Sequence, residues 1–145
     1  MCWWIKKKVI SPETLTPKST EKITCAELTS LLKNYVPTAQ IIMADNWKYL
    51  CHYDDIALFL AQDQTNKMEW IEETRDCDDF AFRLKGQFSI PSWSGLALGI
   101  CWTTEPYSHA LNAMVTEDMK LWLIEPQSDE IIDNLKDIKI RLILM

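Results

Sequence analysis

Residues 76–86 read Asp-Cys-Asp-Asp-Phe-Ala-Phe-Arg-Leu-Lys-Gly, and they determine the fold that we expect for the chain. From Cys77 onward, apolar residues recur at the i, i+3, i+4 and i+7 positions that form one face of a helix. Asp76 is a good N-cap, Asp79 falls in the first turn, and Gly86 is a typical C-terminal stop. The pattern predicts a helix that carries Cys77 on its first turn, on the face that packs against the domain.

The first half of the chain predicts two further helices. Thr24 and Glu27 have the spacing of a capping box, which predicts a helix from residue 25 to just before Pro37. An acidic pair at residues 54–55 opens a second apolar helix that reaches residue 60. We also expect a short strand at 47–50 and a polar loop at 62–67.

The second half of the chain reads as strands. A continuous apolar run, two shorter runs and a final alternating segment predict strands at 96–102, 109–115, 121–125 and 138–144. Helices followed by antiparallel strands indicate an α+β domain in which N-terminal helices pack on a C-terminal antiparallel sheet. We expect residues 1–20 to form an N-terminal arm and residues 21–145 to form a single domain.

Composition narrows the class of protein. The chain has 145 residues, of which 48% are hydrophobic, and this length and content suit one globular domain. A net charge of −6 argues against a nucleic-acid partner, because phosphates would be repelled. No apolar segment reaches the roughly 18 residues of a membrane span, and no secretory signal is visible, so we expect a cytoplasmic protein. Five scattered cysteines without a CxxC pair suggest neither a zinc ribbon nor a disulfide framework.

Spacing alone relates His109 to Glu125. If 109–115 and 121–125 form a hairpin across a three- or five-residue loop, His109 and Glu125 face each other directly. The carboxylate would then accept a hydrogen bond from the imidazole and orient the ring. A register error of one residue would separate the two side chains.

Cys77 could complete a nucleophilic group with this pair. The N-terminus of a helix and a nearby imidazolium both favour a thiolate, which is the nucleophilic form of cysteine. The charges of Asp76, Asp78 and Asp79 act in the opposite direction. Each of the three residues also has an ordinary structural explanation when taken alone, since a cysteine on an apolar helix face is usually part of the core.

Two families resemble these motifs. Residues 76–81 resemble the nucleophile helix of bacterial transglutaminase-like cysteine peptidases. Together with His-Ala-Leu-Asn at 109–112 and Ile-Glu-Pro-Gln at 124–127, the chain is more similar to the papain-like protease domain at the C-terminus of a fungal (Marasmius-type) agglutinin. The resemblance covers about residues 45–132. It implies that Cys77 is the nucleophile, His109 the base and Glu125 the residue that orients the base.

The resemblance leaves one catalytic group, the second oxyanion donor, without an assigned residue, and it implies a metal. Papain has an oxyanion-donating glutamine where this chain has Ile71, and the candidates for a second donor are Gln64, Asn46 and Trp47. The agglutinin domain is calcium-dependent, which implies a possible calcium site here. The carboxylates that could supply oxygen ligands are Asp54, Asp55, Asp78 and Asp79.

These observations predict a cysteine hydrolase that cleaves an amide or peptide bond in a protein or peptide substrate, with neither a nucleic acid nor a membrane as partner. Two alternatives stay open. One is an acyl transferase of the transglutaminase type, which would use the same thiol. The other is a non-catalytic binding or scaffold domain on the same fold, using exposed tryptophans such as Trp3, Trp4 and Trp93.

Overall fold

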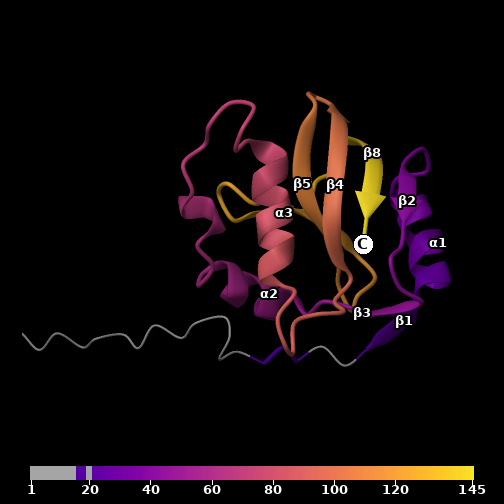
Figure 1. The fold of residues 1–145 in the computed structure, drawn as a ribbon. Coiled ribbons are helices and arrows are strands. Elements are labelled where there is room, and N and C mark those ends of the chain that lie inside the picture. The colour runs from indigo at the N-terminus through magenta and orange to yellow at the C-terminus, as the bar shows by residue number, and fades with distance from the viewer. Residues whose placement is uncertain (1–15, 19–20) are drawn as a thin grey trace, which may run out of the picture.

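The computed structural model describes residues 16–18 and 21–145, so most of the predicted arm, including Trp3 and Trp4, lies outside the described residues. The helices flank a central sheet (Figure 1). The elements in chain order are β1 (Lys22–Thr24), α1 (Cys25–Tyr35), β2 (Gln40–Ile42), β3 (Trp47–Tyr49), α2 (Tyr53–Leu60), the short 3-10 helix η2 (Thr65–Lys67), α3 (Cys77–Gln87), β4 (Leu98–Glu105), β5 (His109–Val115), β6 (Leu121–Glu125), β7 (Glu130–Ile132) and β8 (Lys139–Leu144). No helix in these ranges is long and apolar enough to cross a membrane.

The central sheet has six strands in the order β2-β8-β4-β5-β6-β7. The pair β2–β8 is parallel, and the remaining neighbours are antiparallel. A separate two-stranded sheet joins β1 to β3. The middle of the large sheet is closely packed, because a Cβ atom at Gly99 on β4 would lie 2.0 Å from the carbonyl oxygen of Leu144 on β8.

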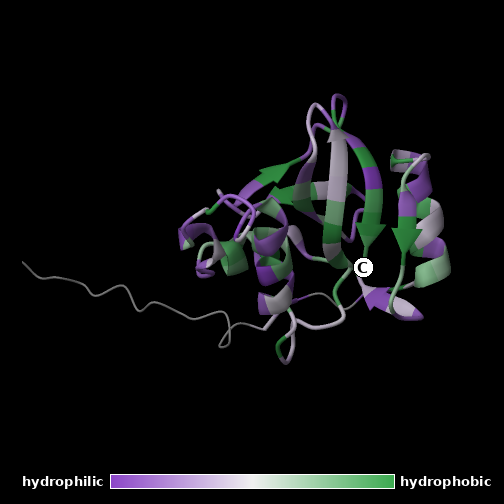
Figure 2. Ribbon diagram, turned by 45° about the horizontal axis from the view of Figure 1, so that its top comes forward, coloured by the Kyte–Doolittle hydropathy of each residue, from purple (hydrophilic) through white to green (hydrophobic). Residues whose placement is uncertain are grey.

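Apolar layers cover both faces of β5. Leu111, Ala113 and Val115 belong to a core that also contains the inner face of α1, while Met114 belongs to a second core with α2 and α3. In Figure 2, hydrophobic colour runs along strands of the sheet, whereas the helices are striped with polar residues. Complete burial of a large aliphatic side chain contributes roughly 1.5–3 kcal/mol to the stability of the folded state. Apolar burial in these two cores is therefore the main stabilising contribution.

The two longest helices begin at the predicted caps. At α1, Thr24 Oγ1 accepts a hydrogen bond from the Glu27 amide, and Glu27 Oε2 accepts one from the Thr24 amide. At α3, Asp76 and Asp79 form the same reciprocal arrangement. Gly86 does not end α3, which continues to Gln87, and the next residue, Phe88, is buried in the core.

The predicted fold class is wrong in its arrangement. The expected fold was α+β, papain-like, with N-terminal helices packed on a C-terminal antiparallel sheet. The structure instead inserts β2, from the first half of the chain, into the sheet beside β8 in a parallel pair, and it places helices against both faces. β1, β2 and β7 have three residues each, and segments this short carry no recognisable alternation.

Two glycine substitutions test the close approach of β4 and β8. Gly99→Ala should lower the free energy of unfolding by about 3 kcal/mol, because the new methyl group collides with backbone rather than with a movable side chain. Gly86→Ala is the matched control: its Cβ would meet nothing within 4 Å, and alanine in a helix should stabilise by about 0.5–1 kcal/mol. Urea denaturation measures both. Equal effects of the two substitutions would contradict this account of the sheet.

Candidate functional site

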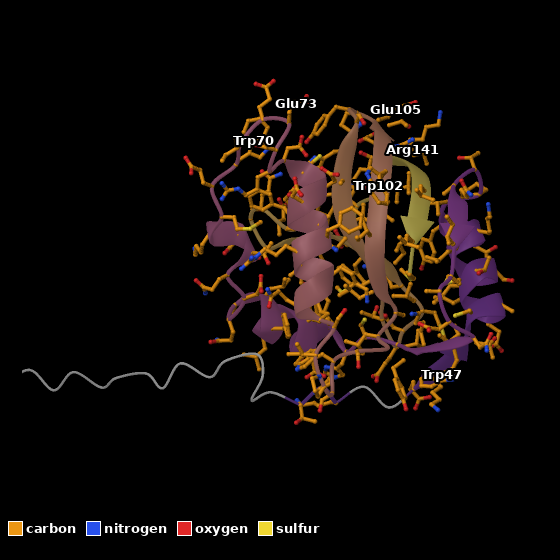
Figure 3. The ribbon with its side chains drawn as sticks, in the orientation of Figure 1. Trp47, Trp70, Glu73, Trp102, Glu105 and Arg141 are labelled. Carbon is orange, nitrogen blue, oxygen red and sulfur yellow. The ribbon has the colours of Figure 1, made fainter. Side chains whose placement is uncertain are left out.

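Cys77 lies on the first turn of α3, directly after the Asp76 cap, and is partly buried. Its side chain packs on a small apolar cluster that contains Ala81 of the same helix, Ala110 of β5 and the partly buried Trp102 of β4. Figure 3 shows Trp102 between α3 and β4. The i, i+4 spacing of Cys77 and Ala81 puts both on the helix face that meets the sheet.

His109 and Glu125 contact each other at the end of the sheet. Nε2 of His109 lies 2.6 Å from Oε2 of Glu125, and the two side chains are 15% and 19% exposed. The other carboxylate oxygen, Oε1, accepts a hydrogen bond from the Gln127 amide at 3.1 Å. Both oxygens of Glu125 are therefore engaged, and the carboxylate fixes the orientation of the imidazole.

The register that brings this pair together differs from the predicted one. The β5–β6 ladder pairs Asn112 with Ile124, which sets Glu125 level with Leu111 rather than with His109. The loop at 116–120 has five residues, which is one of the two predicted loop lengths. The pair of residues that closes it is Val115 with Leu121, one residue later on each strand than the predicted pair of 114 with 120. A register shift of two residues keeps every side chain on the same face of the sheet. His109 and Glu125 therefore still contact each other, as a diagonal pair instead of a directly opposed one.

The structure does not join the thiol to this pair by a hydrogen bond. Cys77 packs on the cluster that contains Ala110, the residue after His109 on β5. Within residues 16–18 and 21–145, Cys77 Sγ makes no hydrogen bond to the imidazole. The site thus contains a formed imidazole–carboxylate pair and a thiol placed beside its strand.

Negative charge surrounds Cys77. Ligand atoms of Asp76, Cys77 and Asp78 lie within 4.8 Å of one another. A hydrogen bond with Asp76 raises the pKa of Asp78, and burial adds to the shift. Among the described residues, these three side chains are the group whose ligand atoms lie close enough together to hold a metal ion. The group does not include Asp54 or Asp55 of α2. The four carboxylates considered for calcium therefore do not form one cluster.

The remaining cysteines are less accessible. Cys51 and Cys101 are fully buried, and burial raises the pKa of each thiol to about 12. Cys25 also opens a capped helix, but it lies in the buried layer beneath α1. Cys2 falls outside the described residues.

The three residues considered as oxyanion donors lie elsewhere or are engaged. The amide of Gln64 donates to the backbone carbonyls of Gln62 and Asp63. Asn46 and Trp47 line a different pocket, next to β3. Figure 3 shows Trp47 at the end of the molecule away from Trp70 and Glu73, two residues of the loop that leads into α3.

The pocket beside β3 is a second candidate site, and the sequence pattern did not indicate it. It has a volume of about 620 Å³ and is open to solvent; its lining residues are Ala44, Asp45, Asn46, Trp47, Ser94 and Gly95. Trp47 is 44% exposed, which is unusual for so large an aromatic side chain. The only sequence signal was the run Asp-Asn-Trp at 45–47, which is not diagnostic by itself.

No family model and no curated protein sequence matches this chain. Solved structures do share its fold. One is titled "PSL1a-E64 complex", with a TM-score of 0.72, and another is Polyporus squamosus lectin bound to the epitope Neu5Aca2-6Galb1-4GlcNAc, with a TM-score of 0.71. Each is 22% identical and aligns over 86% of this chain. The chain spans about half the length of these proteins, 51% and 49% respectively.

The comparison corrects the predicted family and activity. The chain was expected to be a papain-like or transglutaminase-like cysteine peptidase, a hydrolase acting on a protein or peptide. One of the structures that share its fold is instead a lectin, bound to a sialylated saccharide, and neither title names a peptidase. Trp93, expected to be an exposed binding residue, is 1% exposed and belongs to the core.

Burial predicts the order in which cysteines react. Substoichiometric iodoacetamide at pH 7 should label Cys77 before Cys25, Cys51 or Cys101, because Cys77 alone among these four is partly accessible. Peptide mapping of the first labelled site gives the measurement. Denatured protein is the control, in which the four thiols should react at similar rates. Faster labelling of Cys25 in the folded protein would contradict the burial that the structure assigns to it.

Proposed function

We propose that this chain is a non-catalytic binding domain and that its ligand is a saccharide. The observation that carries the proposal is the open pocket beside β3, where an exposed tryptophan adjoins carboxylate, amide and hydroxyl groups. The fold shared with a saccharide-bound lectin supports it. The same pocket geometry is typical of small-ligand sites, which combine an apolar wall with a few placed polar groups.

The chemistry of the pocket suits a sugar ring. A pyranose has an apolar face of C–H groups, which can lie against an indole, and a rim of hydroxyl groups, which need hydrogen-bond partners. Trp47 supplies the apolar wall. Asp45, Asn46 and Ser94 supply acceptors and donors for the hydroxyl groups.

Neighbouring side chains hold the pocket in place before a ligand arrives. Lys22 Nζ lies 3.9 Å above the centre of the Trp47 ring, and the Tyr49 ring meets Trp47 edge-on at 5.1 Å. Lys48 donates a hydrogen bond to Asp45, which lowers the pKa of that carboxyl group and keeps it ionised at neutral pH. A pocket organised in advance loses less entropy when it binds.

A pair of tryptophan substitutions tests the proposal. The ligands are the sialylated trisaccharide named for Polyporus squamosus lectin and its unsialylated disaccharide, measured by isothermal titration calorimetry. Trp47→Ala should weaken binding at least about tenfold, because the aromatic wall is lost. Trp70→Ala is the matched control, since Trp70 is 52% exposed but lies at the other end of the molecule, and it should bind as the wild type does.

Two results would count against the saccharide proposal, and a third would refine it. No measurable binding of either saccharide by the wild-type chain would exclude these ligands. An equal loss of affinity in both variants would show that the pocket beside β3 is not the site. Binding of the sialylated ligand alone would keep the site and narrow the ligand to saccharides that carry a carboxylate.

We also propose a role for Cys77, His109 and Glu125, as a thiol site that binds small ligands. The specific observation is the 2.6 Å imidazole–carboxylate contact next to a partly accessible cysteine on a capped helix. A carboxylate that holds an imidazole stabilises its charged form, and that charge would favour the thiolate of a cysteine close to it. The protein named PSL1a forms a complex with E64, and this gives a probe for the same place in this chain.

Protection of the thiol tests this second proposal. E64 should slow iodoacetamide labelling of Cys77 and leave Cys25 unchanged, as read by peptide mapping. His109→Ala should slow the labelling of Cys77 about tenfold, and Glu125→Gln should slow it less, because the glutamate acts through the ring. Lys139→Ala, a change on the exposed rim of the sheet, should have no effect. Wild-type labelling rates in His109→Ala, or no protection by E64, would contradict the proposal.

A further inference from the structure

The ladder between β4 and β8 contains two bulges near one end of the central sheet. On β8, Arg141 is the extra residue, because its two neighbours pair with consecutive residues of β4. On β4, Thr104 is the extra residue, because its two neighbours pair with consecutive residues of β8. A β-bulge leaves one residue outside the ladder and re-aims its side chain, and bulges are common next to functional sites. Each of these facing strands therefore carries one unpaired residue at this point.

The two unpaired residues line the same pocket, which we call the bulge pocket. It has a volume of about 440 Å³ and is open to solvent. Thr38, from the turn between α1 and β2, lines it as well, so three separate segments of the chain build it. Its lining residues are Thr38, Thr104, Glu105, Lys139, Ile140 and Arg141.

The bulge pocket is separate from the pocket proposed for the saccharide. The described residues that line it differ from those that line the pocket beside β3. Figure 3 shows Glu105 and Arg141 at the same end of the molecule, away from Trp47. A further pocket of about 480 Å³ shares Glu105 and Lys139 with the bulge pocket, so the two form neighbouring hollows on this surface.

The bulge pocket has a positive charge to spare, although the chain has a net charge of −6. Two cationic side chains and one carboxylate line it. Lys139 Nζ lies 3.3 Å from Glu105 Oε1, so these two charges offset each other. The exposed side chain of Arg141 makes no hydrogen bond or ion pair with any residue that the structure describes. Its guanidinium group is therefore available to an anion.

A lysine holds the third wall of the bulge pocket in position. Lys33 Nζ donates hydrogen bonds to the carbonyls of Pro37 at 3.4 Å and Ala39 at 2.5 Å, the residues on either side of Thr38. This ammonium group fixes the turn and adds a positive charge beside it. A wall that is ordered before a ligand arrives reduces the entropy lost on binding.

We propose that the bulge pocket binds a tetrahedral oxyanion, the phosphate or sulfate group of a small molecule. The guanidinium of Arg141 is always charged and can donate two parallel hydrogen bonds to such a group. The hydroxyl groups of Thr38 and Thr104 supply further donors from the other two segments. A volume of about 440 Å³ lies in the range of small-ligand sites, which leaves room for the molecule that carries the oxyanion.

Calorimetric titration of the full chain tests the proposal. The probes are sodium phosphate, sodium sulfate and glycerol 3-phosphate, with sodium chloride and glycerol as controls. Ionic strength is matched throughout, because salt screens exposed charges. We expect saturable binding of the oxyanions and none of chloride or glycerol. Tighter binding of glycerol 3-phosphate than of inorganic phosphate would support an esterified ligand, and the reverse would support the free ion at the same site.

Substitutions assign the binding to the bulge pocket. Arg141→Ala should weaken it at least about tenfold, and Arg141→Lys should restore only part of the loss, because lysine keeps the charge without the paired donors. Thr104→Val should weaken binding by a smaller factor, since one hydroxyl is removed. Arg83→Ala is the matched control: this arginine is also exposed but lies on α3, and the variant should bind as the wild type does. Unfolding midpoints verify that each variant is folded.

Four results would overturn the proposal. The first is that the wild-type chain binds the three oxyanion probes no better than chloride. The second is wild-type affinity in folded Arg141→Ala. An equal loss in Arg83→Ala and Arg141→Ala would show that overall charge, and not this pocket, attracts the anion. Binding of glycerol as tight as that of glycerol 3-phosphate would show that the oxyanion is not the group recognised.

Discussion

Burial of β5 on both faces organises the rest of the molecule. Residues 110–115 are all buried, and alternate side chains enter the core beneath α1 or the core beneath α2 and α3. The one polar side chain among them, Asn112, donates hydrogen bonds to the carbonyls of Ala81 on α3 and Gly99 on β4. These bonds fix how α3 lies on the sheet, because an amide without partners in this layer would be costly. The place of Cys77 at the start of α3 follows from that anchor.

Local signals in the sequence were sufficient for the elements that have strong caps or long apolar runs. The capping boxes that begin with Thr24 and Asp76 predicted the starts of α1 and α3, and 109–115 and 121–125 are the observed strands β5 and β6. The arrangement could not be predicted in the same way. A three-residue strand such as β2 gains its stability from its partner β8, so its own residues hold no pattern to read.

The contact between His109 and Glu125 shows which part of a pairing argument is robust. The face of the sheet on which a side chain lies depends only on whether its position in the strand is odd or even. A register shift of two residues therefore leaves the face unchanged. The register depends on where the loop closes, which spacing did not determine. Cys77 packs on the apolar cluster that contains Ala110, the next residue of β5, and within the described residues its sulfur makes no hydrogen bond to the imidazole. The motif therefore predicted the identity of the neighbours but not the contact between thiol and imidazole, and a motif by itself does not establish an activity.

The side chains around Cys77 place negative charge at the start of α3. The positive end of a helix can stabilise an anion at its first turn, but in α3 the Asp76 side chain already accepts from the Asp79 amide, and the Asp79 side chain accepts from the Asp76 amide. Asp78 adds further negative charge next to the sulfur. These charges oppose a thiolate, and activation would depend on His109, whose imidazole is hydrogen-bonded to Glu125. The pocket beside β3 needs no such activation, since its tryptophan and polar groups are already held in position by Lys22, Tyr49 and Lys48.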